Sequence, residues 1–334
     1  MWTAKTSLHT ARSHPAAVFY KGRIYVFGGG GPNFLSLDTV EVYNPRNDQW
    51  SWGAPMPTHR SGAVAEVVND RIYVLGGGYK KPDGKFRFLT TVEIYDPGKD
   101  RWEEGPDMLQ PHDYPGVAVS GRHIYIMGGH HPDATEGGPS KDPGFTFCEV
   151  LDVSKGVWAE IAPLPVPRFA LKGAVLNMNN PSIFNNPPLS PFSKGGLRGI
   201  GAEVGVSAEK VLATGGVAFT GQGLTEYDRI DIYDPDRDAW TQEEGLSLPW
   251  PAAAHGVCIH QGGLYIFGGY STEGIHTRAA CYDSGTKAWR MLSPIDKPRA
   301  AMGVVPIEEA IYLAGGWEVD GRTVMDTVIA YLPG

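Results

Sequence analysis

The sequence has no uninterrupted apolar stretch of the roughly 20 residues that are needed to cross a bilayer. Its three cysteines, Cys148, Cys258 and Cys281, are too few for a disulfide framework and do not have the short spacing of a zinc motif. Positive charge is also scarce, because 29 Lys and Arg stand against 37 Asp and Glu and give a formal net charge of −8. We therefore expect no nucleic-acid partner, no membrane association and no cofactor.

The N-terminal stretch MWTAKTSLHTARSH lacks the apolar segment of a signal peptide. We expect a cytoplasmic monomer, or a periplasmic or secreted protein if a leader has been removed. Glycine (44 residues) and proline (27 residues) are plentiful instead, which favours short elements separated by many turns.

A run of strand-forming residues closed by two glycines recurs along the chain. Its six copies are RIYVFGG (23–29), RIYVLGG (71–77), HIYIMGG (123–129), KVLATGG (210–216), LYIFGG (264–269) and IYLAGG (311–316). The first copy extends to YVFGGGGP, and four glycines after a strand also suggest a phosphate loop. No helical pattern follows, so there is no helix N-terminus to receive a phosphate. The repetition identifies the glycine pairs as marks of a repeated unit.

Two further motifs follow the glycine pairs. A strand with a tyrosine or an acid comes first, as VEVYNP (40–45), VEIYDP (92–97), CEVLDV (148–153), DIYDP (231–235), CYDS (281–284) and VIAYLP (328–333). A tryptophan follows in five units, at Trp50, Trp102, Trp158, Trp240 and Trp289. Each unit predicts four short strands, named a to d in chain order, with tight a–b turns that favour antiparallel pairing. A four-stranded unit of about 50 residues, repeated six times, is typical of a β-propeller.

The double glycine, the Tyr-Asp pair and the spaced tryptophan resemble the kelch repeat over essentially the whole chain. The resemblance implies an all-β, six-bladed propeller with four antiparallel strands in each blade. The sixth unit lacks a tryptophan, but Trp2 lies ten residues before Arg12, as Trp50 lies ten before Arg60. We therefore expect the N-terminal strand to complete the last blade and close the ring. The predicted blades are 12–56, 60–108, 112–164, 168–246, 252–292, and 299–333 together with 1–8.

Blade four departs from the regular spacing. Arg168 and Gly215 are 47 residues apart, where the corresponding positions in other blades are 16 apart. The excess forms a loop at about 178–209, which is rich in proline, asparagine, glycine and serine and has no periodicity. Part of it resembles the translated dispersed repeats of bacterial genomes. We expect an accidental insertion, tolerated because long surface loops cost little, with a functional arm as the alternative.

In a propeller, the starts of the a strands and the residues after the glycine pairs meet around one entrance of the central channel, where loops can vary freely. Arginines, histidines and aromatic residues occupy these positions, a set that suits an anionic or sugar-like ligand. The candidate ligand-binding residues are Arg12, Arg60, Arg168, Arg299, His112, Tyr114, Tyr270 and Trp317. The kelch resemblance implies an alternative, in which the arginines bind neighbouring backbone and hold the blades together.

Two charged residues fall on strand a itself, where the other blades have small or apolar residues. Lys172 lies four residues after its arginine position and Glu66 lies six after, so both are expected in the channel. They are candidate catalytic residues, as acid and base, or they contact channel water or each other. Candidate metal ligands are His14, His130, His131 and His255, with ordinary rim histidines as the alternative because no contiguous metal motif is present.

Three functions follow from these residues. We expect first a binding or interaction propeller, with a protein partner or a small anionic or sugar-like ligand at the channel mouth. The second is an epimerase or mutarotase acting on a sugar acid, because the chain resembles in size and architecture the stand-alone bacterial N-acetylneuraminate epimerase, a six-bladed kelch propeller. The third is a mononuclear metal-binding propeller.

Overall fold

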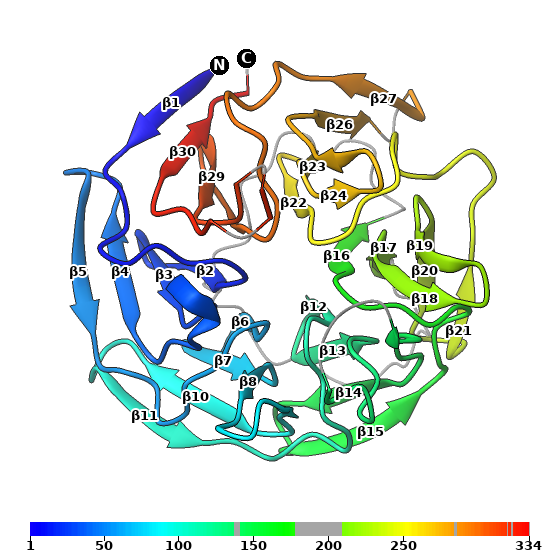
Figure 1. The fold of residues 1–334 in the computed structure, drawn as a ribbon, viewed down its shortest axis with the longest axis horizontal. Helices are drawn as coiled ribbons and strands as arrows, with labels where there is room; N and C mark the ends of the chain where they lie inside the picture. Colours follow the sequence, from blue (N-terminus) through cyan, green and yellow to red (C-terminus); the bar gives the residue numbers. More distant parts are fainter. Residues whose placement is uncertain (137–140, 178–208, 284–285, 319, 322, 334) are drawn as a thin grey trace, which may run out of the picture.

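The protein forms a ring of six four-stranded sheets around a central axis, with its two termini side by side (Figure 1). The computed structural model describes residues 1–334 except 137–140, 178–208, 284–285, 319, 322 and 334. Within each sheet all neighbouring strands run antiparallel. This arrangement confirms the predicted six-bladed propeller. The described residues include no helix that is both long and apolar enough to cross a membrane.

Each blade runs from strand a at the axis to strand d at the outer edge. Blade one contains β2 (Ala16–Tyr20), β3 (Arg23–Phe27), β4 (Val40–Asn44) and β5 (Gln49–Gly53). Blade two contains β6 (Val64–Val68), β7 (Arg71–Leu75), β10 (Val92–Asp96) and β11 (Arg101–Glu104). Blade three contains β12 (Gly116–Ser120), β13 (His123–Met127), β14 (Cys148–Asp152) and β15 (Val157–Ile161).

The second half of the ring repeats this order. Blade four contains β16 (Lys172–Asn177), β17 (Glu209–Thr214), β20 (Ile230–Asp234) and β21 (Ala239–Thr241). Blade five contains β22 (Gly256–His260), β23 (Gly263–Phe267), β26 (Ala279–Asp283) and β27 (Ala288–Met291). Blade six contains β28 (Gly303–Ile307), β29 (Ala310–Ala314), β30 (Val328–Tyr331) and, at its outer edge, β1 (Trp2–Lys5). The pairing of β1 with β30 confirms that the N-terminal strand closes the ring.

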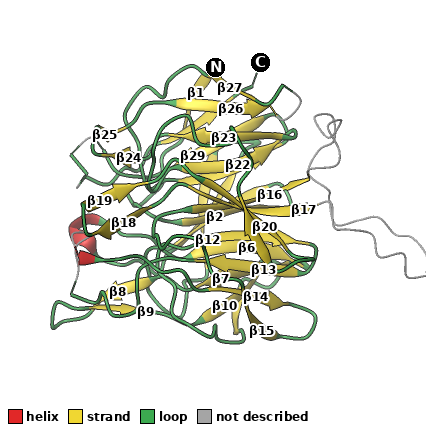
Figure 2. Ribbon diagram, turned by 90° about the vertical axis from the view of Figure 1, so that its right-hand side faces the viewer, coloured by secondary structure: helices red, strands yellow, loops and turns green. Residues whose placement is uncertain are grey.

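One face of the ring carries extra structure in the b–c loops. Three small hairpins project from it in blades two, four and five, at the left of Figure 2. They are formed by β8 (Gly78–Lys80) with β9 (Phe86–Phe88), β18 (Val217–Thr220) with β19 (Gly223–Glu226), and β24 (Tyr270–Ser271) with β25 (Gly274–Ile275). Blade one has the 3-10 turn η1 (Pro32–Phe34) in the same loop. The insertion predicted at about 178–209 lies, except for its last residue, outside the described residues.

The core lies between blades, because alternate residues of each b strand face opposite neighbours. In β3, Tyr25 and Phe27 pack with blade two, whereas Ile24 and Val26 pack with blade six. All four are buried. A b strand is therefore apolar on both faces, which explains the continuous apolar runs before the glycine pairs.

The glycine pairs are required by backbone conformation and by space. Gly28 has φ +53°, and a Cβ there would lie 2.5 Å from the carbonyl oxygen of Arg60 in the next blade. At Gly268 the corresponding distance to the Arg299 carbonyl is 2.0 Å. Any side chain would push neighbouring blades apart, so glycine is needed at these turns.

The spaced tryptophans connect consecutive blades. Each indole N–H donates to a carbonyl in the connection that leaves the preceding blade, at 2.7–2.9 Å. The acceptors of Trp50, Trp102, Trp158, Trp240, Trp289 and Trp2 are Thr6, Ala54, Pro106, Ala162, Ser247 and Ser293, respectively. Trp2 thus occupies the tryptophan position of blade six, as its spacing predicts.

Candidate functional site

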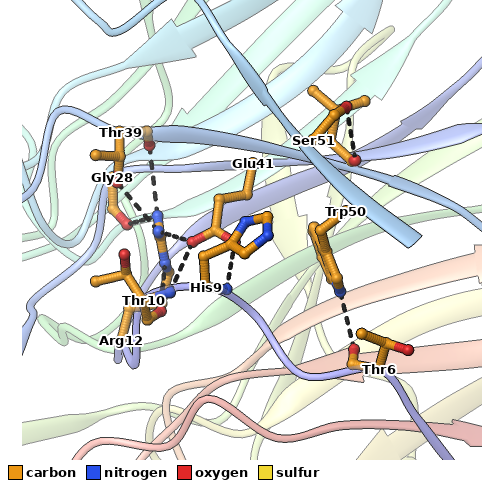
Figure 3. A network of polar contacts seen from close by, with 10 residues as sticks. Thr6, His9, Thr10, Arg12, Gly28, Thr39, Glu41, Trp50 and Ser51 are labelled. Carbon is orange, nitrogen blue, oxygen red and sulfur yellow. Dashed lines mark hydrogen bonds and ion pairs between the residues drawn. The ribbon is translucent and has the colours of Figure 1, made fainter. Parts of the chain in front are cut away.

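The arginines at the starts of the a strands lie inside the blades. Arg12 is fully buried, and its guanidinium donates to the Gly28 carbonyl (2.8 Å), the Thr39 hydroxyl (3.0 Å) and the Glu41 carboxylate (Figure 3). The carboxylate also accepts the backbone N–H of His9 at 2.7 Å. This buried cation and anion therefore have several hydrogen-bonding partners, which compensate for the loss of water.

The same arrangement recurs around the ring. Buried ion pairs or hydrogen-bonded pairs join Arg12 to Glu41, Arg60 to Glu93, His112 to Glu149 and Arg168 to Asp231. Arg299 is also buried and donates to the Gly315 carbonyl at 2.8 Å. These five basic side chains have no surface in the channel mouth, so we remove them from the candidate binding site. Their contacts correspond to the structural alternative that the kelch resemblance implied.

Blade five lacks both members of this pair. Ala252 stands at the arginine position, and Ala280 stands at the position of the acid. The indole of Trp250 donates to the Gly268 carbonyl at 3.2 Å and so replaces the arginine's backbone contact. The acids were not predicted as partners of these basic residues. The joint absence of arginine and acid from one blade was the available signal.

Six backbone hydrogen bonds close a ring around the channel entrance. Two residues after each arginine position, the N–H donates to the carbonyl of the matching residue in the preceding blade, at 2.6–3.3 Å. We call these residues the mouth ring: His14, Gly62, Tyr114, Ala170, Ala254 and Ala301. All six have positive φ, between 47° and 68°. Because five are not glycine and left-handed backbone costs them about 1 kcal/mol each, tertiary contacts must hold the ring in place.

The residues that follow the glycine pairs surround the mouth ring. Backbone contacts join Gly30, Gly78, His130, Val217, Tyr270 and Trp317 to the residues just before the ring members. The side chains around the mouth are therefore absent in blades one and two and large in blades three, five and six. Rings therefore stand at this position in blades three, five and six, blade four has Val217, and at Gly78 the place of a side chain is taken by the Arg87 carbonyl and the Phe88 ring.

Aromatic rings gather at the mouth ring. The His14 imidazole meets the rings of Tyr114 and Trp317 edge-on, with centroids 4.3 Å away in both cases. Tyr114 also meets His130 at 5.0 Å, and Tyr270 meets Trp317 at 6.4 Å. Three predicted ligand-binding residues are thus brought together. The indole N–H of Trp317 is buried and has no acceptor among the described residues.

His130 is held by two aspartates that the sequence analysis missed. Its Nδ1 hydrogen-bonds to Asp142, its Nε2 lies 3.9 Å from Asp113, and its ring stacks with Phe88 and Phe169. Burial raises the pKa of Asp113 to about 7 despite the opposing effect of His130, and one oxygen of this carboxyl is buried without a hydrogen bond. No local motif marks these acids, because the loop fold alone brings them to the histidine.

The channel narrows toward the mouth ring. A narrow chamber of about 20 Å³, lined by His14, Tyr114 and Lys172 among others, lies at the ring and has room for about one water. A middle cavity of about 130 Å³ follows, lined by Lys172 and Glu66. A wide cavity of about 380 Å³, also lined by Glu66, extends toward the a–b turns. The channel is therefore widest at the end remote from the hairpins.

Glu66 and Lys172 both line the channel, as their positions on strand a predict. Burial raises the pKa of Glu66 to about 7 and lowers the pKa of Lys172 to about 8. Neither side chain has a hydrogen bond or ion pair with any described residue. Burial and, secondly, the Lys172 charge lower the pKa values of His14 and His255, which keeps both imidazoles neutral. The channel thus contains an acid and a base that titrate close to neutrality.

The predicted metal ligands do not converge. His14 and His130 share the mouth, but His131 packs against a loop phenylalanine, and His255 is buried beside the Thr214 hydroxyl at 2.9 Å. In the part of the chain that the structure describes, no group of three or more His, Cys, Asp or Glu residues is placed to hold an ion. The geometry gives no support to a metal-binding propeller.

Neutral replacements of the channel charges are expected to raise thermal stability near pH 7.5. The pKa of Glu66 rises from 4.5 to about 7 on folding, so the folded state holds this proton more tightly than the unfolded state. The free energy of unfolding therefore falls as the pH rises from about 4.5 to about 7. Lys172, whose pKa falls from 10.5 to about 8, destabilises the fold below about pH 8, and this penalty is relieved as pH rises toward 10.5. Glu66→Gln and Lys172→Met should each raise the melting temperature by about 1–3 °C. Calorimetry from about pH 5 to 10 checks this, and a lower melting temperature than wild type near pH 7.5 would contradict it.

Comparison with known proteins identifies the repeat. The kelch motif family matches residues 11–57, 59–109 and 251–295, which fall in blades one, two and five. The chain is 25% identical over 307 residues to Kelch-like protein 23 of Homo sapiens, covering 91% of this chain and 46% of the relative. It is 33% identical over 145 residues to Kelch-like protein 35 of Mus musculus, covering 43% and 24%. The chain thus spans half or less of the length of these curated relatives.

A solved structure shares the whole architecture. The structure titled "Structure of YjhT" superposes with a TM-score of 0.72 at 16% sequence identity, covering 98% of this chain and 99% of the other. At this identity the likeness establishes the fold alone. It also shows that a chain of about this length forms the same ring.

Proposed function

Because the chain belongs to the kelch-repeat β-propeller family, we propose that it is a binding module that holds a segment of a protein partner at its channel mouth. The observation that carries the proposal is the group of aromatic rings at the mouth ring. Tyr114, Tyr270 and Trp317 are each partly exposed there, and the Trp317 N–H has no acceptor among the described residues. Rings with a polar tip are enriched at the centres of protein interfaces.

Two further features support a protein segment as the occupant. The three hairpins of blades two, four and five project from the same face as the rings and extend the surface that a partner can contact (Figure 2). Large rings stand at this position in blades three, five and six, as His130, Tyr270 and Trp317, so an apolar or aromatic side chain of the partner can pack against them. The four arginines that had suggested an anionic ligand are buried in the blades, so their guanidinium groups are not available to an anion at the mouth.

Truncation of an aromatic side chain beside the mouth ring should weaken the binding of selected peptides. Peptides are selected from a random library on the wild-type protein, and their affinities for Trp317→Ala and Tyr270→Ala are then measured. We expect each affinity to fall about tenfold or more, because buried aromatic anchors dominate such interfaces. Trp52→Ala is the matched control, since Trp52 is an exposed aromatic residue on the outer strand β5. Peptides that depend on Trp52, or that bind Trp317→Ala as tightly as wild type, would refute the proposal.

A sugar-acid epimerase or mutarotase is the second candidate. It is favoured by one observation, that Glu66 and Lys172 line the same cavity and have pKa values of about 7 and about 8. A general base and a general acid need pKa values near the working pH. Line broadening and magnetisation exchange between the anomers of N-acetylneuraminate, measured by NMR with wild type and Glu66→Gln, test this activity.

A further inference from the structure

The inner channel is a blind tube. The mouth ring leaves only the narrow chamber of about 20 Å³ at one end, whereas the wide cavity of about 380 Å³ lies at the other. The wide cavity is lined by the later residues of the a strands, such as Phe19, Val119 and Ile259, which lead into the a–b turns. A small molecule in the channel therefore enters from the face opposite the hairpins.

Apart from two charged residues, the side chains that line the middle cavity are apolar. Alanine, valine, proline and methionine side chains line the middle cavity together with glycine backbone, and Glu66 and Lys172 are its only charged residues among those described. Apolar walls with a few fixed polar groups are typical of small-molecule sites. A propeller that needed the channel only for packing would have no use for two charges here, because each one costs desolvation.

The two charges lie at different depths. Lys172 lines the narrow chamber and the middle cavity, and Glu66 lines the middle and the wide cavity. They come from β16 in blade four and β6 in blade two, so another blade separates them around the ring. Described residues supply no ion pair for either of them. Lys172 therefore lies nearer the closed end of the tube and Glu66 lies nearer its open end.

We propose that the inner channel is a second binding site, separate from the mouth, which takes a slim zwitterion with its carboxylate on Lys172 and its ammonium on Glu66. Such a ligand supplies the missing partner to both groups at once. Its aliphatic middle lies against the valine and alanine side chains of the middle cavity. Because the charges are at different depths, an amino acid whose two charged groups are separated by a methylene chain fits better than an α-amino acid.

The pKa values give the pH range in which this site is charged. Glu66 is ionised above about pH 7, and Lys172 is protonated below about pH 8. Lys172 lowers the pKa values of the neighbouring His14 and His255, which are neutral in this range, and burial alone shifts the pKa values of Lys172 and Glu66. Affinity should therefore be highest between about pH 7 and 8 and fall on both sides.

The test uses 6-aminohexanoate, hexanoate and hexylamine as probes, with calorimetric titration near pH 7.5. We expect 6-aminohexanoate to bind at least tenfold more tightly than either singly charged probe. Glu66→Gln should remove its advantage over hexanoate, and Lys172→Met should remove its advantage over hexylamine. Trp52→Ala, on the outer surface, should bind all three as wild type does.

The probe series on the wild-type protein decides the proposal even if a variant fails to fold. Equal affinities for the three probes, or no binding of 6-aminohexanoate, would overturn it, since Glu66 and Lys172 would then satisfy each other or remain solvated. A bulky substitution in the wide cavity, Val175→Trp, tests the direction of entry. We expect it to block the probe, and unchanged binding kinetics would show that ligands do not enter from that face.

Discussion

Replacing Arg12 with alanine is expected to lower the free energy of unfolding by about 3–5 kcal/mol, because Glu41 would remain buried without its cation. The substitution also removes the donors to Gly28 and Thr39. Urea denaturation followed by tryptophan fluorescence measures the change. A loss below about 1 kcal/mol would show that the buried carboxylate is satisfied by backbone N–H groups alone.

The chain itself supplies the control for this substitution. Blade five has Ala252 and Ala280 at the two positions, so the double variant Arg12→Ala/Glu41→Ala copies a combination that this fold already contains. We expect the double variant to be more stable than Arg12→Ala, because no buried charge is left unpaired. Simple additivity of the two single substitutions would indicate that the pair does not act as a unit.

Blade six indicates which of the two single substitutions, Arg12→Ala or Glu41→Ala, lowers stability more. Arg299 has no acid at the position that corresponds to Glu41, where Ile329 stands, and it donates to the Thr327 hydroxyl at 2.6 Å and to the Gly315 carbonyl. An arginine without an acid thus occurs in the ring, but none of the six blades has the acid without a basic partner. Glu41→Ala should therefore cost less stability than Arg12→Ala.

Removal of residues 2–5 is expected to lower the free energy of unfolding by about 5 kcal/mol or more. The deletion takes away β1, the packing of Trp2 on Phe267 and Tyr331, and the indole hydrogen bond to Ser293. It also turns β30 into an open edge, which favours aggregation. Chemical denaturation and light scattering of the truncated protein measure both effects.

A synthetic peptide provides the control for this deletion. A peptide of residues 1–8 should bind the truncated protein, restore its unfolding midpoint and suppress light scattering, because it can pair with β30. The same peptide with alanine in place of Trp2 should be much less effective. If the truncated protein is as stable as the full chain, β1 does not lock the ring.

The fold could be predicted because its signals are local and repeated. The glycine pairs, the tryptophans and the ten-residue spacing from Trp2 to Arg12 depend on turns and strand lengths that each blade repeats. Six copies of a local pattern determine the number of blades. The presence of Glu66 and Lys172 in the channel also followed, because strand a lies at the axis in every blade.

The site could be predicted only in part, because it depends on contacts between distant segments. The arginines appeared to be exposed binding residues until their acid partners, about 30 residues further along in blade one, were placed beside them. Alanine rarely adopts left-handed backbone, so the residue type at positions 170, 254 and 301 does not indicate the positive φ found there. Asp113 and Asp142 gave no signal either, because their role depends on where the b–c loop of blade three returns.

The mouth ring has a consequence for how the chain folds. Its bonds join consecutive blades, and the last one connects His14 in blade one with Ala301 in blade six. In an open repeat array each unit can add to the one before it and gain its full stability at once. Here the final contact must close a loop of almost the whole chain, which costs conformational entropy. The contacts that offset this cost form only when the ring is complete. A partly synthesised chain therefore contains well-formed blades but lacks the stability of the complete ring. That stability is gained in one step, when the last blade closes the ring.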